Sequence, residues 1–87
     1  MADVHLPMTL TPLFAGLPRR IDVDAPTVDD AINELDAQWP GLRDRLCEPG
    51  PTIRQHIHVY VDRTRAGLDT AIDERSRVDV ISAISGG

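Results

Sequence analysis

The chain has 87 residues, a length that suits one small domain with a single hydrophobic core and leaves no room for a deep catalytic cleft. Its composition, 41% hydrophobic and 26% charged, is typical of a globular domain rather than a disordered segment. The formal net charge of −5 argues against nucleic acid as the main partner, and no apolar run is long enough to predict a membrane span.

The cysteine and lysine content excludes several kinds of covalent bond and metal site. Cys47 is the only cysteine, so the chain can form neither an internal disulfide nor a cysteine-based zinc site. All nine basic residues are arginines, so the chain offers no side-chain amine and cannot form lysine-linked polymers of itself. The N-terminal stretch lacks the basic residues of a signal peptide and prolines interrupt its apolar run, so we expect a cytoplasmic protein.

The first two predicted elements are short strands that form a hairpin. From Val4 to Leu10, apolar residues alternate with other residues, which is the period of a strand. Residues 11–18 form a loop, and residues 19–23 predict a second strand that places Ile21 and Val23 on one face.

A helix follows the hairpin. Thr27 can cap its N-terminus, and two aspartates in the first turn suit the positive end of the helix dipole. Pro40 and Gly41 end the helix, residues 42–46 predict one further turn, and residues 47–51 predict a loop. The apolar residues at helical spacing are Val28, Ala31, Ile32 and Leu35, with Trp39 extending the same face.

The second half of the chain predicts more strands. Residues 53–61 predict a central strand, in which Ile57, Val59 and Val61 face one way while His56, His58 and Tyr60 face the other. Residues 62–67 predict a polar turn, residues 68–72 a short strand or helical turn, and residues 73–77 a tight turn into the final strand. In that last strand Val78 and Val80 alternate with Asp79 and Ile81.

This order of elements predicts an α+β fold with a mixed sheet of four to five strands and one long helix packed on one face. We expect residues 1–87 to form one domain, with residues 82–87 as a flexible tail. The predicted core consists of Val4, Leu6, Val28, Ile32, Leu35, Ile57, Val59 and Val80.

The chain ends in Gly86 and Gly87, which would add little to a structural strand because glycine loses much backbone entropy on ordering and has no side chain to pack. A glycine tail can instead thread a narrow channel and present an unshielded terminal carboxylate.

These features together resemble the ubiquitin-like β-grasp sulfur carriers of the MoaD/ThiS type. Residues 39–46 are similar to the aromatic-Pro-Gly-aliphatic-Arg-acidic-Arg-Leu stretch that follows the helix in CysO-like members, and residues 56–62 are similar to their central strand. The Gly-Gly end is the third point of resemblance. The chain departs from the pattern at residues 74–76, where the family usually turns with Asp-Gly-Asp, and at Ser82, where a proline is common.

The resemblance implies a carrier that is not itself an enzyme. In such carriers an ATP-using enzyme of the ubiquitin-activating type adenylates the terminal carboxylate, and a sulfur donor then displaces AMP. The thiocarboxylate left on Gly87 delivers sulfur inside a second, biosynthetic enzyme. By this resemblance Ser85, Gly86 and Gly87 form the active tail, Gly87 is the adenylation site, and the chain binds no cofactor or metal of its own.

The sheet face away from the helix is a predicted docking surface for these partners. His58, Tyr60, Ile81 and Ala83 are expected on this face, which has no second layer to cover it. Scattered surface apolarity is the alternative interpretation. His56 and His58 have a spacing that metal sites use, but no third ligand is near in sequence, and Cys47 has no neighbouring base to activate it.

Three functions remain open from the sequence. The first is a sulfur carrier for cysteine or another sulfur-containing metabolite, favoured over a molybdopterin synthase small subunit by the CysO-like stretches. The second is a protein modifier joined through Gly87 to lysines of its targets. The third is an interaction module in which the glycines are inert.

Overall fold

The structure of the chain is a computed structural model that describes residues 1–82. Its elements in order are β1 (Ala2–His5), the 3-10 helix η1 (Thr11–Leu13), β2 (Arg20–Val23), α1 (Val28–Gln38), α2 (Leu42–Leu46), β3 (Cys47–Glu48), β4 (Thr52–Ile53), β5 (Ile57–Val61), β6 (Thr64–Ala66) and β7 (Arg77–Ser82). Five of the strands form one sheet in the order β2-β1-β7-β5-β6. Strands β1 and β7 run parallel and the other neighbours run antiparallel, so the sheet is mixed as predicted.

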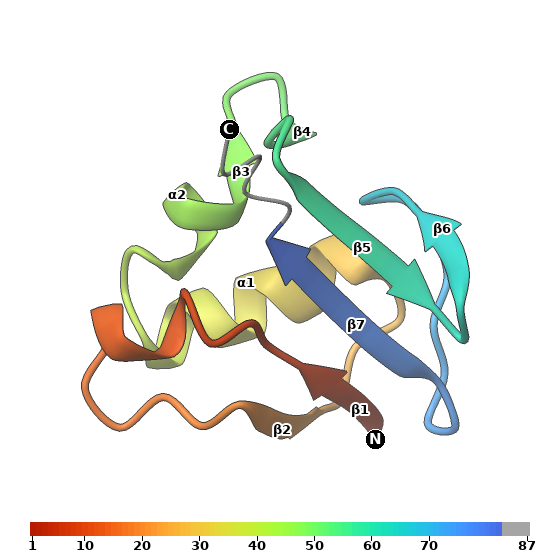
Figure 1. The fold of residues 1–87 in the computed structure, drawn as a ribbon. Coiled ribbons are helices and arrows are strands. Elements are labelled where there is room, and N and C mark those ends of the chain that lie inside the picture. The colour runs from red at the N-terminus through yellow and green to blue at the C-terminus, as the bar shows by residue number, and fades with distance from the viewer. Residues whose placement is uncertain (83–87) are drawn as a thin grey trace.

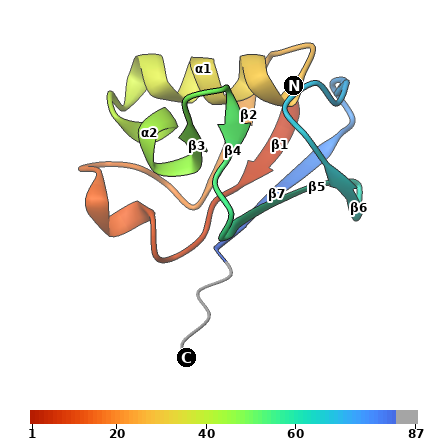
Figure 2. The same cartoon turned by 90° about the horizontal axis from the view of Figure 1, so that it is seen from above.

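Helix α1 crosses one face of the sheet, and the two views show the helices and the sheet as separate layers (Figures 1 and 2). Thr27 caps the helix as predicted, because its side-chain oxygen accepts a hydrogen bond from the backbone N–H of Asp30 at 3.1 Å. The apolar face of the helix is buried against the sheet, and it consists of Val28, Ala31, Ile32 and Leu35.

The core contains the predicted residues and a second group that the sequence did not single out. Seven of the eight predicted core residues are buried, and Ile57 is partly buried and packs against them. Leu42 and Leu46 of α2 are 0% and 1% exposed, and Leu10 and Leu17 from the long loop after β1 are also buried. The core therefore extends beyond the space between α1 and the sheet, to the end where α2 lies.

Polar contacts from the Pro-Gly-Leu-Arg stretch, residues 40–43, hold α2 against α1. Arg43 forms an ion pair with Asp29 at 2.7 Å and donates a hydrogen bond to Asn33 at 2.8 Å. The carboxylate of Asp36 accepts hydrogen bonds from the backbone N–H groups of Gly41 at 3.1 Å and Arg43 at 3.0 Å. These N–H groups belong to the start of α2 and have no partner within the helix, so Asp36 caps it from the neighbouring helix.

Several predicted strand boundaries are wrong. Strand β1 ends at His5 rather than continuing to Leu10, because Pro7 has no N–H to donate and its carbonyl starts a turn by accepting from the N–H of Leu10 at 3.0 Å. The predicted strand over residues 53–61 is two strands, since Ile53 belongs to β4 and β5 begins at Ile57. Strand β5 is also not central, because β7 holds that position.

Two predicted turns contain strands. Residues 47–51 were expected to be a loop, but Cys47 and Glu48 form β3, which pairs with β4. Residues 62–67 were expected to be a polar turn, but residues 64–66 form β6 as the second arm of a hairpin with β5. The turn between them uses Asp62 and Arg63, both with positive φ, at 49° and 72°. Residues 68–72, expected as a short strand or a helical turn, form a turn at residues 68–69 and one isolated bridge between Ala71 and Thr27.

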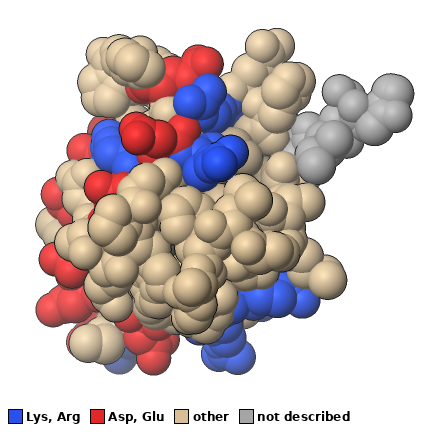
Figure 3. Space-filling view, turned by 90° about the vertical axis from the view of Figure 1, so that its left-hand side faces the viewer, with Lys and Arg blue, Asp and Glu red and all other residues tan. Residues whose placement is uncertain are grey.

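Charged side chains are unevenly distributed over the surface. Figure 3 views the molecule from the side of η1 and α2, and it shows carboxylates gathered along the left edge of this face. The centre of the same face is uncharged; guanidinium groups mixed with carboxylates border it above, and guanidinium groups border it below.

Candidate functional site

Strand β7 leads to the C-terminal residues, and the sheet holds it on both sides. Its neighbours are β1, with Val4 opposite Val78, and β5, with Ile57 opposite Ser82. Ser82, the first residue of the expected tail, is therefore still the last residue of the central strand. Strand β7 is paired with β1 over Arg77–Asp79 and with β5 over Val78–Ser82, so at Ser82 the neighbour is β5.

The predicted docking residues within the described part of the chain come together. The register of β5 and β7 places His58 opposite Ile81 and Tyr60 opposite Asp79, which puts all four on one face of the sheet. That face points away from α1, because the alternate residues Val59 and Val80 are buried in the core. Ile81 is 46% exposed, and His58 and Tyr60 are half-buried. The fourth predicted residue, Ala83, lies outside the described residues, as do Ser85, Gly86 and Gly87.

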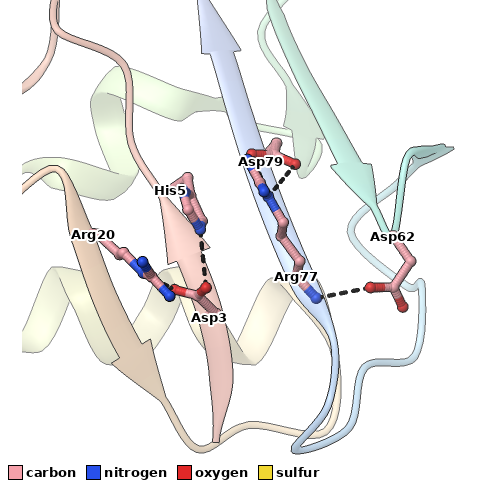
Figure 4. A network of polar contacts seen from close by, with 6 residues as sticks. All are labelled: Asp3, His5, Arg20, Asp62, Arg77 and Asp79. Carbon is pink, nitrogen blue, oxygen red and sulfur yellow. Dashed lines mark hydrogen bonds and ion pairs between the residues drawn. The ribbon is translucent and has the colours of Figure 1, made fainter.

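The outer face also carries a polar network that the sequence analysis missed (Figure 4). Asp3 accepts a hydrogen bond from Arg20 at 2.9 Å and contacts His5 at 3.0 Å. Arg77 pairs with Asp79 at 3.1 Å. The hydrogen bond from Arg20, with a smaller contribution from His5, holds the pKa of Asp3 below its usual value. The outer face thus carries a band of charged pairs over β2, β1 and the start of β7, beside the predicted docking residues His58, Tyr60 and Ile81.

A sequence signal for this network did exist. Asp3 and His5, like Arg77 and Asp79, are two residues apart on their strands, and that spacing places both members of each pair on the same face. The link from Asp3 to Arg20 depends on the pairing of β1 with β2, which the sequence alone does not specify.

The remaining sequence candidates were the thiol of Cys47 and a metal site at His56 and His58. Cys47 is buried, and burial raises the pKa of its thiol, which disfavours the reactive thiolate. Within residues 1–82, His, Cys, Asp and Glu side chains form no group of three or more that could hold a metal ion. The same residues include no helix long and apolar enough to cross a membrane.

Comparison with known families decides the classification. The model of the ThiS family matches residues 13–87, which cover most of the chain and include the Gly-Gly end. The chain belongs to the ThiS family. This confirms the family predicted from the Trp-Pro-Gly stretch, the strand with alternating histidines and the terminal glycines.

Individual relatives of this ThiS-family chain agree with that assignment. The chain is 29% identical to the sulfur carrier protein CysO of Mycobacterium tuberculosis over 90 residues, which cover 97% of this chain and 96% of that protein. It is 35% identical to small archaeal modifier protein 3 of Haloferax volcanii over 72 residues, which cover 78% of this chain and 76% of that protein.

Solved structures confirm the β-grasp fold predicted for this member of the ThiS family. The structure of CysO from Mycobacterium tuberculosis has a TM-score of 0.85 and 24% identity, and it covers 97% of this chain and 100% of that one. The Amycolatopsis orientalis BexX/CysO complex contains a chain with a TM-score of 0.88 and 21% identity, with full coverage of both chains.

Proposed function

We propose that this ThiS-family chain is a sulfur carrier whose C-terminal carboxylate, on Gly87, is adenylated and converted to a thiocarboxylate. The thiocarboxylate donates sulfur in the synthesis of cysteine or another sulfur-containing metabolite. In this role the chain is a co-substrate of partner enzymes in the cytoplasm and contributes no catalytic residue or bound cofactor of its own.

The observation that carries the proposal is the family match over residues 13–87, which includes Gly86 and Gly87. The geometry of β7 supports it, because a strand fixed in the centre of the sheet can present its C-terminal extension in a constant direction. The five residues after Ser82 span at most about 18 Å when extended, which is long enough to enter a partner's active site while the domain docks outside it.

The chemistry is a pair of substitutions without any change of oxidation state. A carboxylate oxygen of Gly87 attacks the α-phosphorus of ATP, and pyrophosphate leaves. Hydrosulfide then attacks the carbonyl carbon of the acyl adenylate, the bond to the AMP oxygen breaks, and the proton of the hydrosulfide passes to water. The product is a thiocarboxylate, whose sulfur is a softer and stronger nucleophile than the oxygen it replaces.

We propose further that the outer face at His58, Tyr60 and Ile81 docks the adenylating enzyme. Replacing Ile81 by Asp should weaken binding at least about tenfold, because docking would bury an unpaired carboxylate. The thermal midpoint should stay nearly unchanged, since Ile81 is 46% exposed and faces away from the core. Loss of the folded state in this variant would contradict the assigned orientation of Ile81.

The experiment that tests the carrier function is incubation of the chain with the adenylating enzyme of its own organism, ATP and sulfide. Intact mass spectrometry should show one oxygen replaced by sulfur, and fragmentation should place the sulfur on Gly87. A variant lacking Gly86 and Gly87 is the control, and it should remain folded and unmodified. Sulfur transfer to the acceptor by the deletion variant would contradict the proposal.

A second candidate function is conjugation to other proteins through Gly87. The 35% identity to small archaeal modifier protein 3 favours it, because that relative is named as a modifier. The chain lacks lysine, so its conjugates would join it to the lysines of other proteins and not to further copies of itself. Isopeptide-linked Gly-Gly remnants on target lysines in the source cell, lost when Gly87 is deleted, would support this function.

A further inference from the structure

Strand β2 forms one edge of the five-stranded sheet, and within residues 1–82 no strand pairs with its outer side (Figure 1). The N–H of Leu6 donates to the carbonyl of Arg19 at 2.6 Å, so residues 6 and 19 extend the β1–β2 ladder as a hydrogen-bonded pair. Such pairs alternate in an antiparallel ladder, so Ile21 also bonds to β1, whereas Arg20 and Asp22 direct their backbone N–H and C=O groups outward. Strand β2 therefore offers two donors and two acceptors to a strand that lies beside it.

The same two residues carry opposite charges, and one of these charges lacks a partner. Asp22 lies opposite Asp3 in the register of β1 and β2, and like charges in that position repel each other. Arg20 donates through Nε to the carboxylate of Asp3 at 2.9 Å (Figure 4), whereas Asp22 forms no ion pair with any other residue of 1–82. Arg20 is 72% exposed, and its terminal nitrogens make no ion pair within the described part of the chain. The edge thus holds an unpaired carboxylate beside a guanidinium with spare donors.

This arrangement is complementary to itself. A two-fold axis through Ile21 places Arg20 of one copy opposite Asp22 of a second copy, and the same pairing recurs on the other side of the axis. In that register the outward N–H and C=O groups of both copies meet, and each cross-strand pair of side chains has opposite charges. Registers centred on Arg20 or on Asp22 instead place two like charges opposite each other. Charge therefore selects one register for self-pairing.

The other edge of the sheet lacks this complementarity. Strand β6 has Arg65 on the strand and Arg63 in the turn before it, and neither forms an ion pair within residues 1–82. Pairing β6 with a second β6 would bring these arginines together. Charge of one sign is a common way in which proteins keep an edge strand single. The alternation of sign on β2 has the opposite effect.

We propose that two copies of this chain associate through their β2 edges, so that Arg20 of each copy lies opposite Asp22 of the other and the two five-stranded sheets become one. This inference does not depend on the carrier function. Strands β1 and β7 separate the junction from β5, so the face at His58 and Tyr60 stays uncovered in both copies. An edge of four residues provides less than the roughly 1,000 Å² that a stable interface buries, so we expect a reversible dimer with a dissociation constant of about 0.1–1 mM.

Sedimentation velocity of the full chain, from about 10 μM to about 2 mM, measures this association. In ¹⁵N–¹H NMR spectra recorded over the same range, the backbone N–H signals of Arg20 and Asp22 should shift most, because they acquire acceptors in the dimer.

A charge swap on β2 tests the register. Asp22→Arg should weaken association at least about tenfold, because it places arginines opposite each other across the axis. The change also makes the acidic chain less negative, which by itself favours association, so a loss of overall charge cannot explain the weakening. The double variant Arg20→Asp/Asp22→Arg has the wild-type net charge and opposite charges in register, and it should restore association to within about threefold. The arginine introduced at position 22 then lies opposite Asp3, so that carboxylate keeps a cation beside it.

A proline at position 22 tests the backbone pairing. Asp22→Pro removes an outward N–H without removing a bond to β1, whereas Asp22→Ala removes the same charge and keeps the N–H. We expect the proline variant to associate at least about tenfold more weakly than the alanine variant. Circular dichroism melts verify that each variant is folded, and the charge swap tests the proposal separately if the proline variant is not.

Four results would overturn the proposal. They are a wild-type chain that stays monomeric up to about 2 mM, a dimer whose NMR shifts lie on β6 or elsewhere outside β2, undiminished association of Asp22→Arg, and a double variant as weak as that single variant. The first of these would leave the β2 edge without a second copy as its partner.

Discussion

Truncation of Ile32 is the most direct test of how α1 packs on the sheet. Ile32 is 3% exposed and belongs to the buried cluster between the helix and the strands. Ile81 carries the same side chain at 46% exposure on the opposite face. The pair Ile32→Ala and Ile81→Ala therefore makes one chemical change in two environments.

The expected loss for Ile32→Ala follows from its burial. Removing the buried methylene and methyl groups at about 0.8 kcal/mol each gives about 2.4 kcal/mol. The cavity left behind adds up to about 1.5 kcal/mol if the surrounding side chains do not close it. We therefore expect the free energy of unfolding to fall by about 2–4 kcal/mol, which is a large part of the stability of a domain of this size. Ile81→Ala should change it by less than about 1 kcal/mol.

Urea denaturation followed by circular dichroism measures both values. The slope of unfolding free energy against urea should be the same in both variants and in the wild type, so that the shift in midpoint reports stability alone. A loss for Ile32→Ala that is no larger than the loss for Ile81→Ala would refute the assigned helix face.

Three further predictions concern the described side chains. Asp36→Ala should destabilise the fold by about 1–2 kcal/mol in the same urea assay, because two backbone N–H groups at the start of α2 lose their acceptor, whereas Asp36→Asn should cost less. Cys47 should react with iodoacetamide at least about a hundredfold more slowly in the folded chain than in urea, since the thiol is buried and its pKa is raised; equal rates would contradict its burial. Arg20→Gln should raise the pKa of Asp3 towards its usual value in an NMR titration. In the wild type the Asp3 carboxylate stabilises the fold above its usual pKa, and this small contribution is lost as the pH falls through the lowered pKa of the folded chain.

The sequence predicted those elements whose signals are local. Thr27 and the apolar spacing of α1 give the helix and its start without reference to the rest of the chain. Strand β7 was predicted from the alternation of Val78 and Val80 with Asp79 and Ile81, and the structure places those side chains as expected. Both signals are side-chain patterns that repeat with the period of one element.

The missed elements depend on pairing between segments. Strand β6 is polar and its residues do not alternate. The turn before it places Asp62 and Arg63 at positive φ, whereas the usual sequence signal for such a hairpin turn is Asn-Gly or Asp-Gly. Strands β3 and β4 have two residues each, too few to show any period. His58, Tyr60 and Ile81 were predicted to share one face of the sheet, and the register of β5 and β7 places them so. Met8, Leu13 and Arg45, which line hollows beside Ser82, were not predicted, because they come from a loop, η1 and α2 and only the folded chain brings them to one end of β7.

The parallel pairing of β1 with β7 has a mechanical consequence. The chain enters the sheet at one end of β1, and β7 ends at the opposite end of the sheet (Figure 1). A partner that pulls on the C-terminal residues applies force along β7, so the hydrogen bonds to β1 and β5 are loaded in shear and resist together rather than opening one at a time. We expect single-molecule stretching between the two termini to give a high unfolding force, and a low force would show that these strands unzip sequentially. A domain loaded in this way can have its tail drawn through an enzyme and withdrawn again while the domain itself stays folded.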